Sequence, residues 1–172
     1  MNINTIKLII VSFLLTVFVC HTATADFVIS AGGRRHTEHS AFDELPFVDD
    51  DMSYSIGMEV HESAGYWQLL VGYAPEAGNV TNNIDYVLTP QLNVLFRDGM
   101  WVGGTGILSS RVSTDGDDEW TDLYWQLMFG LEFTTAYIKL EVLAIYPFEG
   151  WDTIGDFEFD DIDYGGAIKI VF

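Results

Sequence analysis

The sequence predicts an all-β fold, an antiparallel barrel of eight strands that spans a membrane, from three features. Eight segments between Phe27 and Phe172 alternate apolar and polar side chains with a period of two, the pattern of strands with two unlike faces. The connections between these segments are alternately long and short. The last segment ends directly on an aromatic residue, which suits a strand whose end reaches a membrane surface.

The start of the chain predicts a secretory signal peptide. It holds one cation, Lys7, then the apolar run Leu8–Val19, and then small and polar residues up to Ala25. That run is shorter than the roughly 20 residues that a membrane-spanning helix needs. Cys20 raises the alternative of a lipoprotein, but the bulky residues before it disfavour lipidation. We therefore expect a signal peptide over residues 1–25 and one barrel domain over residues 26–172.

Each predicted strand has bulky apolar side chains on one parity and small or polar ones on the other. The first four are Phe27–Arg35 (FVISAGGRR), Met52–Val60 (MSYSIGMEV), Tyr66–Ala74 (YWQLLVGYA) and Asp85–Arg97 (DYVLTPQLNVLFR). Because proline lacks a backbone N–H, we expect a local bulge at Pro90 in the fourth.

The remaining four strands follow the same rule with one exception. They are Trp101–Val112 (WVGGTGILSSRV), Leu123–Glu132 (LYWQLMFGLE), Tyr137–Tyr146 (YIKLEVLAIY) and Asp163–Phe172 (DYGGAIKIVF). In the fifth strand of the chain, Gly103, Gly104 and Gly106 obscure which parity faces outward and indicate a second bulge.

The connections predict the orientation of the barrel. Those after the second, fourth and sixth strands are of hairpin length, whereas the other four are longer. This alternation is typical of periplasmic turns and extracellular loops, and it places both termini on the periplasmic side.

Aromatic residues of the apolar parity then fall into two bands, one near each rim. The outer band holds Tyr54, Tyr73, Tyr86, Trp125, Tyr146 and Tyr164, and the inner band holds Phe27, Trp67, Phe96, Trp101 and Phe172. Two such bands are typical of membrane barrels. The alternative, a soluble β-sandwich or lipocalin-like barrel with the apolar parity inside, accounts for the alternation but not for the bands, the leader or the terminal Phe.

The final segment resembles the C-terminal signal of bacterial outer-membrane β-barrels. That resemblance implies recognition by the barrel-assembly machinery through the terminal aromatic and the alternating apolar positions, which are Tyr164, Ile168, Ile170 and Phe172. The chain after residue 25 also resembles the small OmpA-like and OmpX-like barrel families in architecture. This second resemblance implies a monomer in the bacterial outer membrane, in contact with lipid and lipopolysaccharide. It also implies a role in envelope integrity, adhesion or surface interaction.

The polar parity predicts a filled lumen, because eight strands enclose a space just wide enough for side chains. Charges in such a space need partners. We expect a salt-bridge plug in the periplasmic half, formed by Glu59, Arg97, Glu132, Lys139, Glu141 and Lys169. A proton relay, a gate or a narrow ion-conducting channel are the alternatives.

Charge excludes one class of partner and raises another. All 26 acidic residues follow Ala25, against six basic ones, so nucleic acid is not an expected partner. The acids gather in the long connections, where oxygen-rich clusters can hold Ca²⁺ or Mg²⁺. A loop cation site is one interpretation of Asp115, Asp117, Asp118 and Glu119; a solvated, repulsive surface is the other.

An enzyme, such as a lipid A acyl hydrolase, is a further alternative. His36, Glu38, His39 and Ser40 are the candidates on the outer side, whereas the stretch His61–Ser63 falls in a predicted periplasmic turn. The His-x-Ser-Asn pattern of lipid A deacylase barrels is absent from the sequence. The sequence therefore assigns no catalytic residue and no cofactor.

Overall fold

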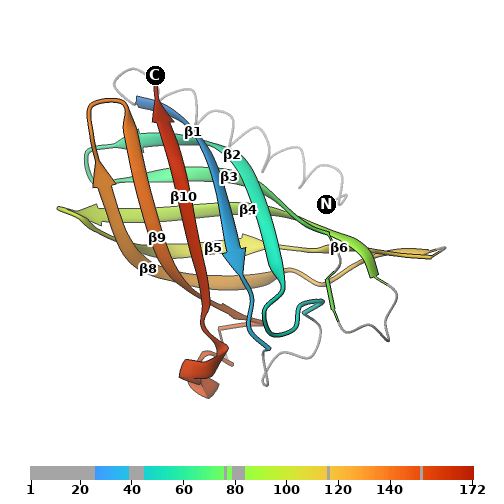
Figure 1. The fold of residues 1–172 in the computed structure, drawn as a ribbon. Helices are drawn as coiled ribbons and strands as arrows, with labels where there is room; N and C mark the ends of the chain where they lie inside the picture. The colour runs from blue at the N-terminus through green and yellow to red at the C-terminus, as the bar shows by residue number, and fades with distance from the viewer. Residues whose placement is uncertain (1–25, 39–44, 76, 79–83, 116, 152) are drawn as a thin grey trace, which may run out of the picture.

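The computed structural model of the protein is a closed antiparallel barrel (Figure 1). It describes residues 26–38, 45–75, 77–78, 84–115, 117–151 and 153–172; the predicted signal peptide lies outside them. Within these ranges, eight strands pair in the order β3-β2-β1-β10-β9-β8-β5-β4, and a β3–β4 pairing closes the ring. They are β1 (Asp26–Arg35), β2 (Met52–Glu62), β3 (Gly65–Pro75), β4 (Ile84–Asp98), β5 (Trp101–Leu108), β8 (Tyr124–Thr134), β9 (Ile138–Phe148) and β10 (Asp163–Val171). The predicted eight-stranded antiparallel barrel is confirmed.

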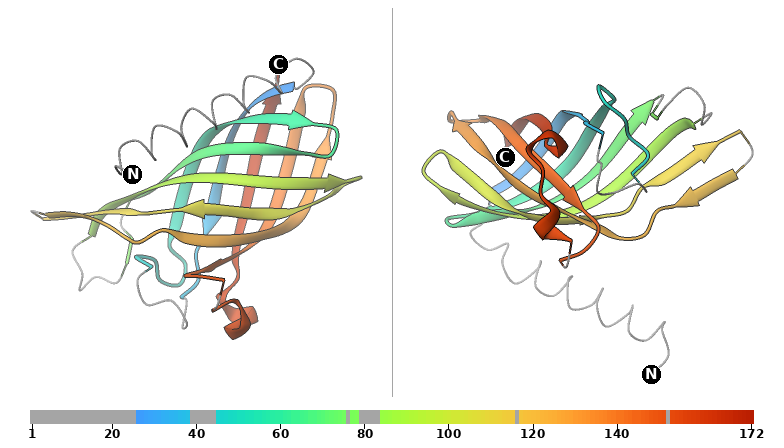
Figure 2. Two further views of the ribbon diagram at one scale, coloured as in Figure 1. Left: turned by 180° about the vertical axis from the view of Figure 1, so that it is seen from behind. Right: turned by 90° about the horizontal axis from the view of Figure 1, so that it is seen from below.

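Two further strands form a hairpin that projects beyond the barrel wall (Figure 2). β6 (Arg111–Thr114) continues the line of β5 and pairs with β4, and β7 (Asp117–Trp120) pairs with β6. The sequence analysis placed Asp117–Trp120 in a loop, which is wrong. Acidic residues have low strand propensity, and pairing with β6 overrides that preference.

Pro90 does not form the expected bulge. The β3–β4 ladder runs through the Val71–Pro90 pair without a shift. On the other side, β4 pairs with β5 up to Gln91–Leu108 and with β6 again from Leu88–Arg111, in the same register. Proline removes a donor and so interrupts pairing here, but no residue is inserted. The register shift in β4 lies between Ile84 and Tyr86 instead.

The glycines of β5 do not form a bulge either. Gly103, Gly104 and Gly106 pair in unbroken register with both β4 and β8. A Cβ on Gly104 would clash with the Val94 carbonyl and one on Gly106 with the Asn93 side chain, whereas Gly103 lies beside the outward-facing Phe129 ring. Glycine at 104 and 106 is therefore needed for packing rather than for an inserted residue.

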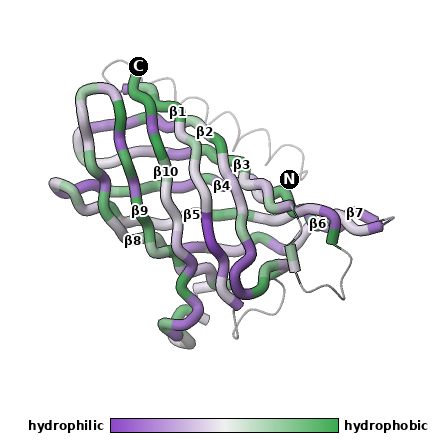
Figure 3. The backbone as a smooth tube through the Cα atoms, viewed as in Figure 1, coloured by the Kyte–Doolittle hydropathy of each residue, from purple (hydrophilic) through white to green (hydrophobic). Residues whose placement is uncertain are grey.

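The apolar parity faces outward and the polar parity faces inward. Ile56 is 65% exposed and Phe96 67% exposed, whereas Glu59 and Lys169 are fully buried. This distribution contradicts the soluble alternative, in which the apolar parity fills the barrel. Figure 3 shows apolar and polar residues alternating along the strands.

The aromatic residues occupy both rims as predicted, with one exception. Tyr54 pairs with Tyr73, whose ring lies 6.1 Å from that of Tyr86, at the end that carries the long connections. The exception is Tyr146, which is only 6% exposed because Phe157 of the β9–β10 connection packs against its ring at 4.8 Å.

The long connections pack against one another at this end. The β9–β10 connection contains two 3₁₀ turns, η1 (Ile154–Asp156) and η2 (Phe159–Asp161). Asp51, before β2, accepts hydrogen bonds from the backbone N–H groups of Val48 and of Gly78 after β3. These bonds join two connections, whereas the opposite end carries the hairpin turns and the C-terminus (Figure 1). Helices of the length and apolarity needed to cross a bilayer do not occur among the described residues.

Candidate functional site

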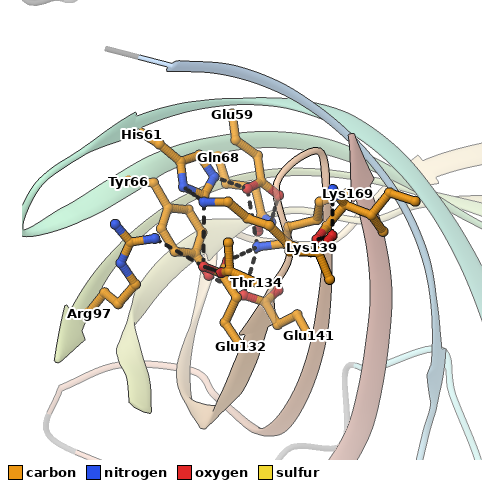
Figure 4. A network of polar contacts seen from close by, with 12 residues as sticks. Glu59, His61, Tyr66, Gln68, Arg97, Glu132, Thr134, Lys139, Glu141 and Lys169 are labelled. Atoms are coloured by element: carbon orange, nitrogen blue, oxygen red, sulfur yellow. Dashed lines mark hydrogen bonds and ion pairs between the residues drawn. The ribbon is translucent and has the colours of Figure 1, made fainter. Parts of the chain in front are cut away.

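A charged network fills the lumen near the hairpin turns, and Lys169 is at its centre (Figure 4). Because Ile168 and Ile170 face outward on β10, strand alternation sends Lys169 inward. Its Nζ lies 2.7 Å from Glu141 Oε2, 3.1 Å from Glu59 Oε2 and 3.4 Å from Glu132 Oε2. One buried cation therefore serves three carboxylates from three other strands.

Two more cations complete the network. Arg97 Nη1 is 3.1 Å from Glu132 Oε1, and Lys139 Nζ is 3.5 Å from the same oxygen. The structure thus brings together all six lumen residues that the sequence analysis singled out. Three carboxylates face three cations, so the formal charge of the set is zero, which limits the cost of burying them.

Further members of the network were not predicted from the sequence, among them His61, Tyr66, Gln68 and Thr134, and His61 was misplaced. His61 was assigned to a turn, but β2 extends to Glu62, so His61 shares the inward face with Glu59. Its Nε2 lies 2.6 Å from Glu59 Oε2 and its Nδ1 lies 2.9 Å from Lys139 Nζ. If the predicted strand had been extended by two residues to Glu62, the alternation of side chains would have placed His61 on the inward face.

Tyr66 and Gln68 are uncharged partners from β3. Tyr66 stacks on His61 with ring centroids 4.3 Å apart and donates its hydroxyl proton to Glu141, and its ring faces Lys169 Nζ at 4.2 Å. Gln68 Nε2 donates to Glu59 Oε1 at 2.6 Å. Gln68 thus contacts a carboxylate oxygen that the cations do not reach, whereas Tyr66 shares Glu141 Oε2 with Lys169.

A row of amides and a guanidinium links this network to the half of the lumen near the long connections. Asn93 donates to Gln68 at 2.7 Å, Gln126 donates to Asn93 at 2.9 Å, and Arg34 Nη1 donates to Gln126 Oε1 at 2.9 Å. A cavity of about 60 Å³ lies beside this row. The interior is therefore hydrogen-bonded along most of its length.

The buried carboxylate of Asp163 is the common hydrogen-bond partner of several side chains at the end of the lumen near the long connections. Arg34 Nε lies 2.7 Å from its Oδ2, and the backbone N–H and hydroxyl of Thr37 donate to Oδ1 at 2.8 and 3.0 Å. His36 Nδ1 lies 3.0 Å from Oδ2, and His36 Nε2 lies 2.8 Å from Ser53 Oγ. The sequence analysis named His36 but related it to Ser40; residues 39–44 lie outside the described ranges, and Glu38 is near Asp49 instead.

Three positions of the predicted assembly signal lie on the outer face of β10, and the fourth, Phe172, directly follows that strand. Tyr164, Ile168, Ile170 and Phe172 are exposed, and the Phe172 ring is 6.5 Å from that of Phe27. The backbone N–H of Phe172 also donates to the Phe27 carbonyl at 2.9 Å. The C-terminal strand thus closes the barrel against β1, with the apolar side chains accessible from outside.

The four acidic residues of the predicted loop cation site are not gathered around one point. Asp117, Asp118 and Glu119 lie in β7, whose alternation turns Asp118 away from its two neighbours. Asp118 is paired with Arg111, and hydrogen bonds from Ser113 and then Arg111 hold its pKa below the ordinary value. Among the residues described, no group of three or more His, Cys, Asp or Glu side chains converges as a metal site would require.

Comparison with known proteins is limited to architecture. No protein-family model matches the chain, and no curated protein matches it. Among solved structures, the chain is similar to the crystal structure of Neisserial surface protein A, with a TM-score of 0.47 and 12% identity over 86% of this chain and 96% of that one.

Proposed function

We propose that this protein is an outer-membrane barrel with a closed lumen, which acts at the cell surface through its acidic outer connections. The observation that supports it most strongly is the inverted surface. Large apolar side chains cover the outside between two aromatic bands, while paired charges fill the inside. In water, that exterior would expose a large apolar area, whereas a bilayer makes it favourable.

Cell fractionation tests the proposed location. Expressed with its own leader in a Gram-negative host, the protein is expected in the outer-membrane fraction and in a folded form that changes gel mobility on heating. Recovery as a soluble periplasmic protein would overturn the proposal.

Deleting Phe172 is expected to lower the folded fraction in the outer membrane, since the terminal aromatic belongs to the assembly signal that the sequence resembles.

The network around Lys169 supports a closed lumen rather than a channel. Lys169, Glu59 and Glu132 are fully buried and span the interior from three strands. In planar bilayers, the purified protein is therefore expected to show no steady conductance above the protein-free bilayer. Steady openings of porin size would contradict the closed lumen while leaving the membrane location intact.

The outer connections support a surface role. Trp151 is 52% exposed and Phe159 79% exposed among the acidic residues of the β9–β10 connection. Exposed aromatics rimmed by charge are typical of contact surfaces. Replacing residues 149–162 by a two-residue Asn-Gly turn is expected to preserve the heat-dependent mobility shift and to reduce adhesion of expressing cells to a surface coated with a basic protein. Unchanged adhesion would argue against this connection as the contact surface.

A further inference from the structure

Three side chains at the outer end of the lumen meet in the geometry of a hydrolytic triad. Ser53 comes from β2, His36 directly follows β1, and Asp163 begins β10. Ser53 Oγ is 2.8 Å from His36 Nε2, and His36 Nδ1 is 3.0 Å from Asp163 Oδ2. Each ring nitrogen therefore faces the partner that a nucleophile, base and acid arrangement requires.

The surroundings of Asp163 set the tautomer of His36. An ionised carboxylate only accepts hydrogen bonds, and Oδ1 already accepts two from Thr37. The proton of a neutral His36 must then be on Nδ1, which leaves Nε2 as the acceptor for the Ser53 hydroxyl. Phe47 stacks on the imidazole at 3.7 Å and 8°, which fixes the plane of the ring. The base is thus positioned and oriented before any substrate arrives.

A cavity adjoins the hydroxyl. Ser53 and Arg34 both line the space of about 60 Å³ in the lumen. A water molecule needs about 10–15 Å³ of such volume, so the cavity has room for a few waters or one very small acyl group. Arg34 also lines this wall, and because its Nε and Nη1 already donate to Asp163 and Gln126, its remaining N–H groups are the donors for an oxyanion. A fatty acyl chain is too large, so the cavity size selects short acyl groups.

We propose that Ser53, His36 and Asp163 form a serine esterase site for esters of short carboxylic acids, an activity separate from the structural and surface roles above. Ser53 Oγ attacks the ester carbonyl while its proton passes to His36 Nε2, and Arg34 faces the resulting oxyanion. The intermediate collapses, the C–O bond to the alcohol breaks, and the alcohol leaves with the proton from His36. Water then attacks the acyl-serine with the same base, which releases the acid and restores Ser53. Asp163 is a positioning residue.

Small electrophiles test the site in the folded, detergent-solubilised protein. Methanesulfonyl fluoride is expected to sulfonylate Ser53, located by peptide mass spectrometry, and p-nitrophenyl acetate is expected to be hydrolysed. Ser53→Ala should abolish both. Ser55 is the internal reference for labelling, because it lines the same cavity but only Ser53 lies within hydrogen-bond distance of His36 Nε2. Ser109→Ala is the control variant and should leave both reactions unchanged, because Ser109 donates its hydroxyl to the Thr121 carbonyl and does not line the cavity.

The role of the base is tested by His36→Gln, which is expected to slow sulfonylation of Ser53 by about 100-fold or more, in the range that a positioned base contributes. If that variant does not fold, the wild-type protein still tests the role of His36 through the ratio of Ser53 to Ser55 modification. Both serines line one cavity, from which the reagent reaches either, so a higher rate at Ser53 reports its activation. Modification of Ser53 no faster than that of Ser55, or wild-type hydrolysis equal to that of Ser53→Ala, would show that the three residues are only a structural hydrogen-bond network.

Discussion

Replacing Lys169 by methionine is expected to destabilise the folded barrel by about 3–5 kcal/mol, the usual cost of removing one partner from a buried ion pair. Lys169 is fully buried, and its ammonium is within 3.4 Å of three carboxylates. Methionine fills a similar volume, so the loss of stability is due to the missing positive charge rather than to a packing defect. Urea-dependent unfolding in lipid vesicles, followed by tryptophan fluorescence and gel mobility, measures the free energy of unfolding.

An exposed ion pair provides the control for this experiment. Arg35 pairs with Asp50 at the outer rim, where both side chains are more than half exposed. Because surface pairs contribute about 0–1 kcal/mol, Arg35→Met is expected to change stability by no more than that. Adding Glu141→Gln to Lys169→Met should restore part of the loss, since it removes one of the uncompensated carboxylates. Equal effects at Lys169 and Arg35 would contradict a network that stabilises the barrel.

Replacing Gly130 by alanine is expected to have the second-largest effect, a loss of about 3 kcal/mol, at the upper end of the range for overpacking. A Cβ at this position would be 1.9 Å from the carbonyl oxygen of Val142 and 2.9 Å from Leu143 Cα. Both atoms belong to the backbone of β9, which pairs with β8 at this point. The added methyl group therefore cannot be accommodated unless the β8–β9 ladder moves.

Gly166 offers a matched substitution on a different strand. It lies in β10, and a Cβ there would be 3.5 Å from Glu141 O, an ordinary van der Waals distance. Gly166→Ala is therefore expected to be neutral or to stabilise by less than about 1 kcal/mol, through the lower entropy of the unfolded chain. The same urea unfolding compares the two variants. Similar stabilities would show that β8 and β9 adjust without cost and that the close approach at Gly130 is unimportant.

Much of the barrel could be predicted from the local sequence pattern, because side chains alternate between the two faces of a strand whichever strands lie beside it. Parity alone placed Lys169 and Glu141 in the lumen and Ile56 on the outside, as the structure has them. Strand ends were less predictable. His61 was missed because a hairpin end depends on cross-strand pairing with Tyr66, which no local pattern specifies.

Pairing across strands also overrode local expectations at single residues. Pro90 interrupts one ladder without a bulge, because the β3 ladder on its other side continues in register through it. The acidic residues of β7 form a strand because β6 offers them an edge. In both places the neighbouring strand decided the outcome, and that neighbour is known only once the barrel closes.

The sequence by itself determined the eight strands of the barrel, their antiparallel order and the two faces of each, but not the β6–β7 hairpin, since the former follow from a period of two and from connection lengths. Only the tertiary structure decided which inward residues touch. Lys169 and Glu59 are far apart along the chain, as are His36 and Asp163, and closure of β1 against β10 brings each pair within hydrogen-bond range. The physical reason is that parity gives a side chain its direction, whereas register and closure give it its neighbours.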